Sequence, residues 1–350
     1  MPFETDHSLS TILSIDSTID STSSIEQNER PMKRHLAYLF FLGLLINTGT
    51  ASADLLDGSR AGDSYGPALS VQSVQTQFGD SEINAGYATV SILKNRLQIL
   101  LTGNLEDNFN HLTLFIDSVT GGQNIILPDT NNGGVNPATD SNLLFENYSG
   151  VGTSGSASGP GFTFDTGFAA DYVMSCQYGD TGFNFNFLSV GNDSIAESSI
   201  DIFGGSTQGS NASVGASSIG VAFDNSNIAG VQAGTGAANA VNAQAVLTGI
   251  ELFIPLTAIG NPVEGDTIRI SAHVNNSNHD FLSNQTLGGL VVPQGNLGGD
   301  GAGNFTNDVS LINLNNFAGD QFFSVIIDLD DDSSFFVVPV AENKAIILDL

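Results

Sequence analysis

Apolar and polar side chains alternate along the stretch Ile268-Arg269-Ile270-Ser271-Ala272-His273-Val274. Successive side chains of a β-strand point to opposite faces of its sheet, so this period of two predicts a strand with one face in a core. Phe183, Phe185 and Phe187 alternate with two asparagines in the same way. An amphipathic helix would instead repeat its apolar residues every three or four positions.

Strand-length runs continue on both sides of these two. They lie at 97–102, 112–116, 219–223 and 250–254, and near 69–78, 86–93, 170–178 and 321–327. Short strands joined by turn-rich connections predict an all-β protein, an antiparallel, jelly-roll-like β-sandwich of roughly ten strands. The one helical turn that we expect spans Leu256–Gly260. The Ser/Gly-rich stretches Ser149–Gly161 and Gly204–Ser218 are expected to be mobile loops.

The N-terminal region has the pattern of an export signal. Residues 32–53 combine a basic start, an apolar run from Leu36 to Ile46 and a final Ala-Ser-Ala. This order is typical of a cleavable secretory signal peptide, and the run is too short to span a bilayer. Residues 1–31 are expected to be disordered, an extension of the gene model before Met32, or a long n-region. N-terminal sequencing of the secreted product should find a start near Asp54.

The charge is strongly negative: 37 Asp and Glu stand against 8 Lys and Arg, a net charge of −29. After residue 53, 31 acids and five bases remain, so the imbalance belongs to the predicted domain. Such a surface repels phosphate backbones and anionic headgroups, which excludes nucleic acid as an expected partner. With 41% hydrophobic residues the chain can still build a core.

We expect one β-sandwich domain over 54–327, followed by an acidic turn and an apolar tail over 328–350. No Pro-rich or charged linker divides the predicted domain. The single cysteine, Cys176, lies in an apolar run, where it is expected to be buried and inert. The predicted location is outside the cell or on its surface, without a membrane span once the signal is cleaved.

Two segments resemble known sandwich domains. They are similar to carbohydrate-binding module family nine and the related DOMON domains. The first combines Leu112–Ser118 with Gly121–Asn124, and the second is Gly249–Gly260. The resemblance implies a β-sandwich that binds a glycan. Such modules usually stack sugars on exposed aromatics, and this chain has no Trp. The tyrosines that could replace it are Tyr65, Tyr87, Tyr148, Tyr172 and Tyr178, with interior packing as the alternative.

Further segments resemble exported bacterial proteins of mostly unknown function. They are Val71–Asp80, Gly103–Asn110, His279–Gln285 and Phe317–Gln321. Members of this group often end in a Pro-Glu-Pro sorting signal. Residues 338–342 keep a Val-Pro pair but lack the following Glu-Pro, which weakens the expectation of sorting by that route.

Catalytic motifs occur without their structural context. Gly62–Gly66 spells Gly-x-Ser-x-Gly, but no strand precedes it, so a surface turn is expected. Gly150–Gly155 matches a phosphate-loop spelling inside a Ser/Gly stretch. His273 and His279 could form a metal-ligand pair, although solvent-exposed or capping histidines are the expected alternative for these two and for His111.

Calcium is the best-supported ligand, because oxygen donors gather in predicted turns. The candidate metal ligands are Asp117, Asp129, Asp328, Asp330 and Asp332. A solvated acidic turn is the alternative for each group. The sequence therefore predicts a non-catalytic, exported protein that serves as a surface or matrix component or as a binding module. Its expected partners are an extracellular glycan or other surface proteins. The alternative is a secreted glycan hydrolase that uses an Asp/Glu pair.

Overall fold

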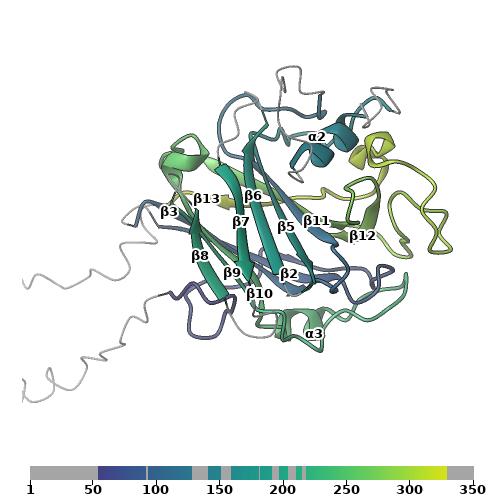
Figure 1. The fold of residues 1–350 in the computed structure, drawn as a ribbon, viewed down its shortest axis with the longest axis horizontal. Helices are drawn as coiled ribbons and strands as arrows, with labels where there is room; N and C mark the ends of the chain where they lie inside the picture. Colours follow the sequence, from purple (N-terminus) through teal and green to yellow (C-terminus); the bar gives the residue numbers. More distant parts are fainter. Residues whose placement is uncertain are drawn as a thin grey trace, which may run out of the picture. The chain divides into compact units, whose positions relative to one another are not determined.

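The computed structural model describes residues 54–91, 94–127, 141–150, 159–180, 182–190, 197–203, 210–214 and 218–328. All of them belong to one compact unit, Ser52–Leu350. They form two antiparallel β-sheets (Figure 1), which confirms the predicted all-β sandwich. Residues 1–53, with the predicted signal peptide, and 329–350 lie outside the described residues.

The first sheet has six strands in the order β1-β2-β3-β10-β9-β8. Its strands are β1 (Ser70–Val71), β2 (Glu82–Ser91), β3 (Arg96–Asn104), β10 (Gly249–Pro255), β9 (Ile219–Phe223) and β8 (Ser210–Val214). Strand β8 contradicts the predicted loop over Gly204–Ser218, because Ser210–Val214 pairs with β9 along its whole length. Its small polar residues carry no alternation that sequence reading could detect.

The second sheet has seven strands in the order β12-β11-β4-β5-β6-β7, with β13 also paired to β11. Its strands are β4 (His111–Asp117), β5 (Tyr172–Gly179), β6 (Gly182–Ser189), β7 (Glu197–Phe203), β11 (Thr267–Asn275), β12 (Leu282–Thr286) and β13 (Phe323–Ile326). Residues 268–274, with their alternating side chains, thus form most of β11. This strand contacts three others, β4, β12 and β13.

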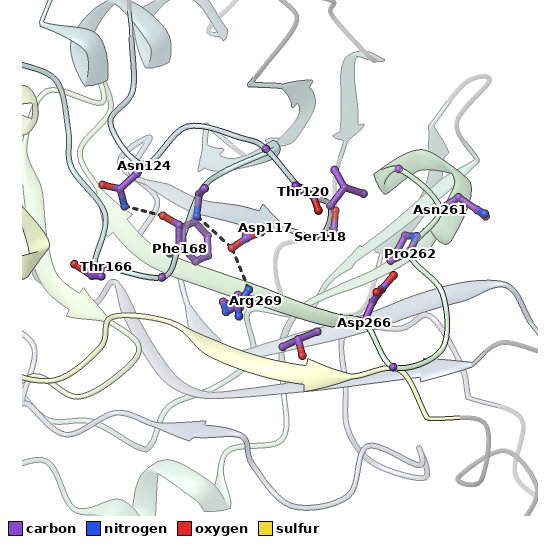
Figure 2. A pocket seen from close by; sticks show the side chains of 17 residues that line it. Asp117, Ser118, Thr120, Asn124, Thr166, Phe168, Asn261, Pro262, Asp266 and Arg269 are labelled. Carbon is purple, nitrogen blue, oxygen red and sulfur yellow. Dashed lines mark hydrogen bonds and ion pairs between the residues drawn. The ribbon is translucent and has the colours of Figure 1, made fainter.

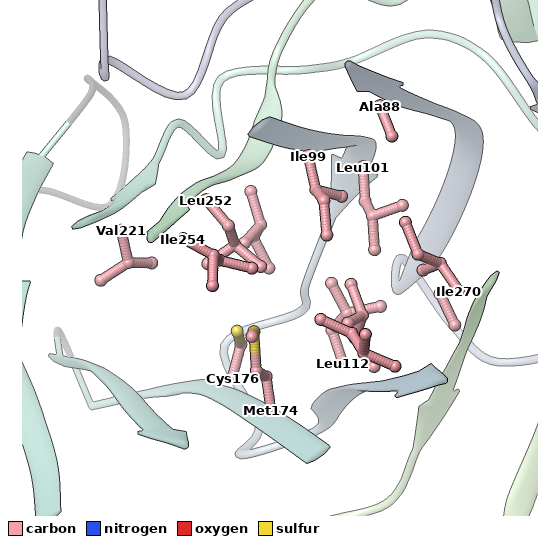
Figure 3. Packing of buried hydrophobic residues seen from close by; sticks show 14 of the residues in the cluster. Ala88, Ile99, Leu101, Leu112, Met174, Cys176, Val221, Leu252, Ile254 and Ile270 are labelled. Atoms are coloured by element: carbon pink, nitrogen blue, oxygen red, sulfur yellow. The ribbon is translucent and has the colours of Figure 1, made fainter. Parts of the chain in front are cut away.

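The main core lies between the two sheets (Figure 3). Ile99 and Leu252 of the first sheet share one buried cluster with Leu112, Met174 and Ile270 of the second. Cys176 belongs to this cluster and is 1% exposed, which confirms its predicted burial. Burial also raises the pKa of its thiol, so the sulfur stays protonated and unreactive.

Short helices and long connections also cover the outer face of the second sheet. Helix α2 (Ser141–Ser149) and the 3-10 turns η2 (Val309–Leu311) and η3 (Leu314–Asn316) contribute Leu144, Val309 and Leu314 to a second buried cluster with Phe115. Helix α3 (Ala240–Ala245) contacts β1 and β2 of the first sheet. The predicted turn at Leu256–Gly260 is the 3-10 turn η1 (Leu256–Ile259). The prediction of a single helical turn is wrong, because the described residues form four further short helices or turns, α2, α3, η2 and η3.

Candidate functional site

Three connections line an open polar cavity of about 820 Å³ at one end of the second sheet. We call it the Asp117 pocket. Its walls come from the segment after β4, from 166–169 before β5, and from 260–267 between η1 and β11 (Figure 2). Loops placed at strand ends by a rigid sheet are common binding positions, because their side chains can vary without disturbing the core.

An ion pair across two strands forms the floor of this pocket. Asp117 ends β4 and lies opposite Arg269 in the register of β4 with β11. Arg269 Nη1 lies 3.4 Å from Asp117 Oδ2, which also accepts a hydrogen bond from the Ala169 N–H at 3.2 Å. Burial raises the pKa of Asp117, and the Ala169 N–H and Arg269 partly offset this effect. The Arg269 side chain keeps 35% of its surface exposed, so it can also reach a ligand.

Side-chain hydrogen bonds to the backbone hold the loops of the pocket in place. Asp171 Oδ2 accepts the N–H groups of Ser118 and Val119 at 2.9 and 3.0 Å. The Ser118 hydroxyl donates to the Ile259 carbonyl at 2.8 Å, and the Asn124 amide donates to the Phe168 carbonyl at 2.7 Å. The three walls are therefore tied together before any ligand arrives, which lowers the entropic cost of binding.

The lining has the chemistry of a hydrogen-bonding site. It offers a second carboxylate, amides and hydroxyls beside the Asp117–Arg269 pair: Asp266, Asn124, Asn261, Ser118, Thr120, Thr166 and Thr267. Asp117 was a predicted metal ligand. In the structure its Oδ2 pairs with Arg269 and accepts the Ala169 N–H. The pairing with Arg269 could not be predicted from the sequence, because 152 positions separate the two residues.

The other predicted metal ligands are placed differently. Asp328 is exposed, just after β13, while Asp129, Asp330 and Asp332 lie outside the described residues. Among the described residues, the one group of three acids whose ligand atoms lie within 4.8 Å of one another is Asp57, Asp63 and Glu251. Sequence reading missed this acidic triad, although a glutamate in the middle of the apolar strand β10 was a signal for it.

The triad is organised around Glu251, which is fully buried. Glu251 Oε1 accepts the Tyr65 hydroxyl at 2.6 Å, and Oε2 accepts the N–H groups of Asp57 and Gly58 at 2.9 and 3.0 Å. Burial raises the pKa of Glu251 to about 7 and raises that of Asp63 as well. Asp63 Oδ2 is enclosed without a hydrogen-bond partner among the described residues.

The three histidines of the described chain come together in the interior. His111, His273 and His279 are each 0% exposed, so the prediction of solvent-exposed histidines is wrong. The rings of His111 and His279 lie 3.7 Å apart, and the Asn275 amide lies 2.8 Å from His279 Nδ1. The Tyr148 hydroxyl of α2 hydrogen-bonds His273 Nε2. Hydrogen bonds within this cluster make the burial of these side chains tolerable, and His273 Nδ1 alone among their ring nitrogens has no partner among the described residues.

The five tyrosines of the described residues do not form a sugar-stacking platform. Tyr65, Tyr87, Tyr148 and Tyr178 are buried, at 6% exposure or less. Tyr172 is partly buried and stacks on Phe187 at 5.6 Å. None of these tyrosines lines the Asp117 pocket.

Comparisons with protein-family models, curated proteins and solved structures found no match to this chain. The resemblance to carbohydrate-binding and DOMON domains thus stays a prediction. Within the described residues, no helix has the length and apolar character needed to cross a membrane. The described residues form a β-sandwich with a polar pocket at one end of the second sheet.

Proposed function

We propose that this protein is an exported, non-catalytic binding module whose ligand is a glycan held in the Asp117 pocket. The observation that carries the proposal is the open, about 820 Å³ cavity whose walls are fixed by hydrogen bonds and whose lining is rich in polar side chains. A cavity of this size can take a small saccharide unit. Secretion or display at the cell surface would bring it to extracellular glycans.

The lining suits the hydroxyl groups of a sugar. A hydroxyl both donates and accepts, so it can bond a carboxylate, an amide and a guanidinium in turn. Asp117 and Arg269 offer charged partners on adjacent strands, and charge-assisted hydrogen bonds are stronger than neutral ones. Asn261 and Thr120 contribute further polar groups at the loops.

Replacement of Arg269 by glutamine is expected to weaken glycan binding by at least about tenfold, the loss of one good charged contact. The measurement is a glycan array followed by calorimetric titration of the best hit. Arg60→Gln is the matched control, since Arg60 packs on Tyr87 and does not line the pocket. An array without reproducible hits would overturn the binding proposal in favour of a surface or matrix component.

A hydrolase is the second candidate, because Asp117 and Asp266 line the same cavity. Glycoside hydrolysis needs two carboxyl groups on either side of the scissile bond. Incubating the best array hit with the protein and analysing the products separates the two functions. Intact glycan supports the binding module, whereas cleavage that Asp266→Asn abolishes would establish the hydrolase instead.

Calcium is proposed as a stabilising ligand, since hard oxygen donors lie close together in the acidic triad and recur along the sequence 328–332. Millimolar calcium is expected to raise the thermal unfolding midpoint by several degrees, because an ion that binds only the native state shifts the equilibrium toward it. Asp63→Asn tests the acidic triad, and a triple Asp→Asn change at 328, 330 and 332 tests the segment 328–332. Asp224→Asn is the control. Magnesium at the same concentration is the comparison, and an unfolding midpoint that is the same in calcium as in magnesium would contradict the proposal.

A further inference from the structure

A second cavity, of about 680 Å³, opens beside the first sheet. We call it the Glu82 cavity. It is formed by the segment 76–80, the start of β2, the end of β3, the segment 227–233 and helix α3. None of its lining residues lines the Asp117 pocket, so it is a separate site.

Glu82 stands out among the residues of this cavity. Its residue surface is only 8% exposed, and its Oε1 accepts the amides of Asn84 and Asn227 at 2.9 and 3.1 Å. Its other oxygen, Oε2, accepts no hydrogen bond from a described residue. A carboxylate oxygen is an acceptor, so Oε2 is free to accept a hydrogen bond from a ligand in the cavity.

The charge of the cavity is negative. Asp80 is the second acid in its lining, and no Lys, Arg or His is among the described residues that line it. Asn104 donates its amide to the Asp80 carbonyl and accepts from Asn227, which fixes the polar side of the wall. The complementary ligand therefore carries positive charge and N–H donors.

Part of the lining is apolar. Ile228 is 100% exposed, and Val231, Ala233 and Ala245 also contribute to the wall. A bare metal ion would leave most of a cavity of this size empty and would find only two carboxylates. A small organic cation would fill it and cover the exposed apolar surface.

We propose that the Glu82 cavity binds a small organic ammonium compound, with the ammonium group donating to Glu82 Oε2 and the carbon chain lying against Ile228 and Val231. Burial raises the pKa of Glu82 to about 7, and the charge of Asp80 acts in the same direction. An ammonium ion binds the ionised carboxylate best, so affinity should rise as the pH increases from 6 toward 8.

Saturation-transfer NMR with n-butylammonium as probe tests this proposal, with 1-butanol as the neutral analogue. We expect n-butylammonium to bind and 1-butanol to bind at least about tenfold more weakly. Glu82→Gln, which keeps an acceptor for the two amides, should cost about tenfold in affinity and remove the pH dependence. Glu264→Gln, an exposed glutamate outside the cavity, is the matched control and should change nothing.

Three outcomes would overturn the proposal. They are equal binding of butanol and butylammonium, unchanged affinity in Glu82→Gln, or equal loss in Glu264→Gln. Asp80→Asn provides a second variant and should weaken binding without reaching the effect of Glu82→Gln. Circular dichroism of each variant shows whether the fold is intact, so that lost binding is not mistaken for lost structure.

Discussion

Replacing Phe115 with alanine is expected to lower the free energy of unfolding by about 3–5 kcal/mol, the usual cost of deleting a buried aromatic ring. Phe115 is 0% exposed at the centre of the cluster on the outer face of the second sheet. Its ring centroid lies 4.9 Å from that of Phe164 and 5.5 Å from that of Tyr148. Urea unfolding followed by circular dichroism measures the change.

The matched control is Val241→Ala, which removes apolar atoms from a side chain that is 76% exposed. This change should stay within about 0.5 kcal/mol, as is usual on the surface. A loss below about 1 kcal/mol in Phe115→Ala would show that the loops covering this face pack loosely. The same variant should weaken ligand binding, because Phe115 supports Phe164, which packs on Phe168 in the wall of the Asp117 pocket.

The strands that could be predicted are those in which apolar side chains alternate. In β4, Leu112, Leu114 and Ile116 point into the core between the sheets, whereas Phe115 points to the outer cluster. Alternation reports this division directly because the period of a strand is two. The alternation over residues 268–274 correctly predicted strand β11 for the same reason.

The strand that escaped prediction most clearly is β12, whose interior is polar. Ser283, Asn284 and Gln285 are each 0% exposed. They are satisfied by distant groups: the Asn284 amide donates to the Gln75 carbonyl at 2.8 Å, and Gln285 Oε1 accepts the Ile83 N–H at 3.3 Å. Hydropathy cannot identify a buried polar strand, since the partners that make burial tolerable are far away in the sequence.

The geometry of the candidate sites could not be predicted for the same reason, because the residues that meet are distant in the sequence. Strand register brings Asp117 and Arg269 together, and the acidic triad joins the segment before β1 to β10. Residue type alone favoured exposed histidines, yet His111 and His279 pack ring to ring in the interior. Chemistry-bearing residues could be named from the sequence, but which of them meet depends on sheet order.

The pH dependence of stability is expected to be set by two opposed buried pairs. Burial lowers the pKa of His273 and of His279 to about 3, so the unfolded chain binds more protons below pH 6.5. Their contribution to stability is therefore lost as the pH falls from 6.5 toward 3. Burial raises the pKa of Glu82 and of Glu251 to about 7, so their contribution is lost as the pH rises from 4.5 to 7.

The two pairs act in opposite directions between pH 4.5 and 6.5. Each fully linked group changes the free energy of unfolding by up to about 1.4 kcal/mol per pH unit, so their effects nearly cancel. The double variant Glu82→Gln and Glu251→Gln removes the pH-dependent contribution of the two glutamates and keeps that of the histidines. We expect its stability to fall by up to roughly 3 kcal/mol per pH unit on acidification, while the wild type changes little over the same range.

Urea unfolding at pH 4.5, 5.5 and 6.5 measures these slopes. The slope is the right quantity, because a substitution cost that does not depend on pH leaves it unchanged. Acidification also relieves repulsion in this acidic chain, but the charge-matched control Glu106→Gln and Glu264→Gln carries the same relief and should follow the wild type. His279→Gln should produce the opposite change, a protein that becomes more stable as the pH falls toward 4.5. Equal slopes in all four proteins would contradict the inference that these buried groups stay neutral in the native fold.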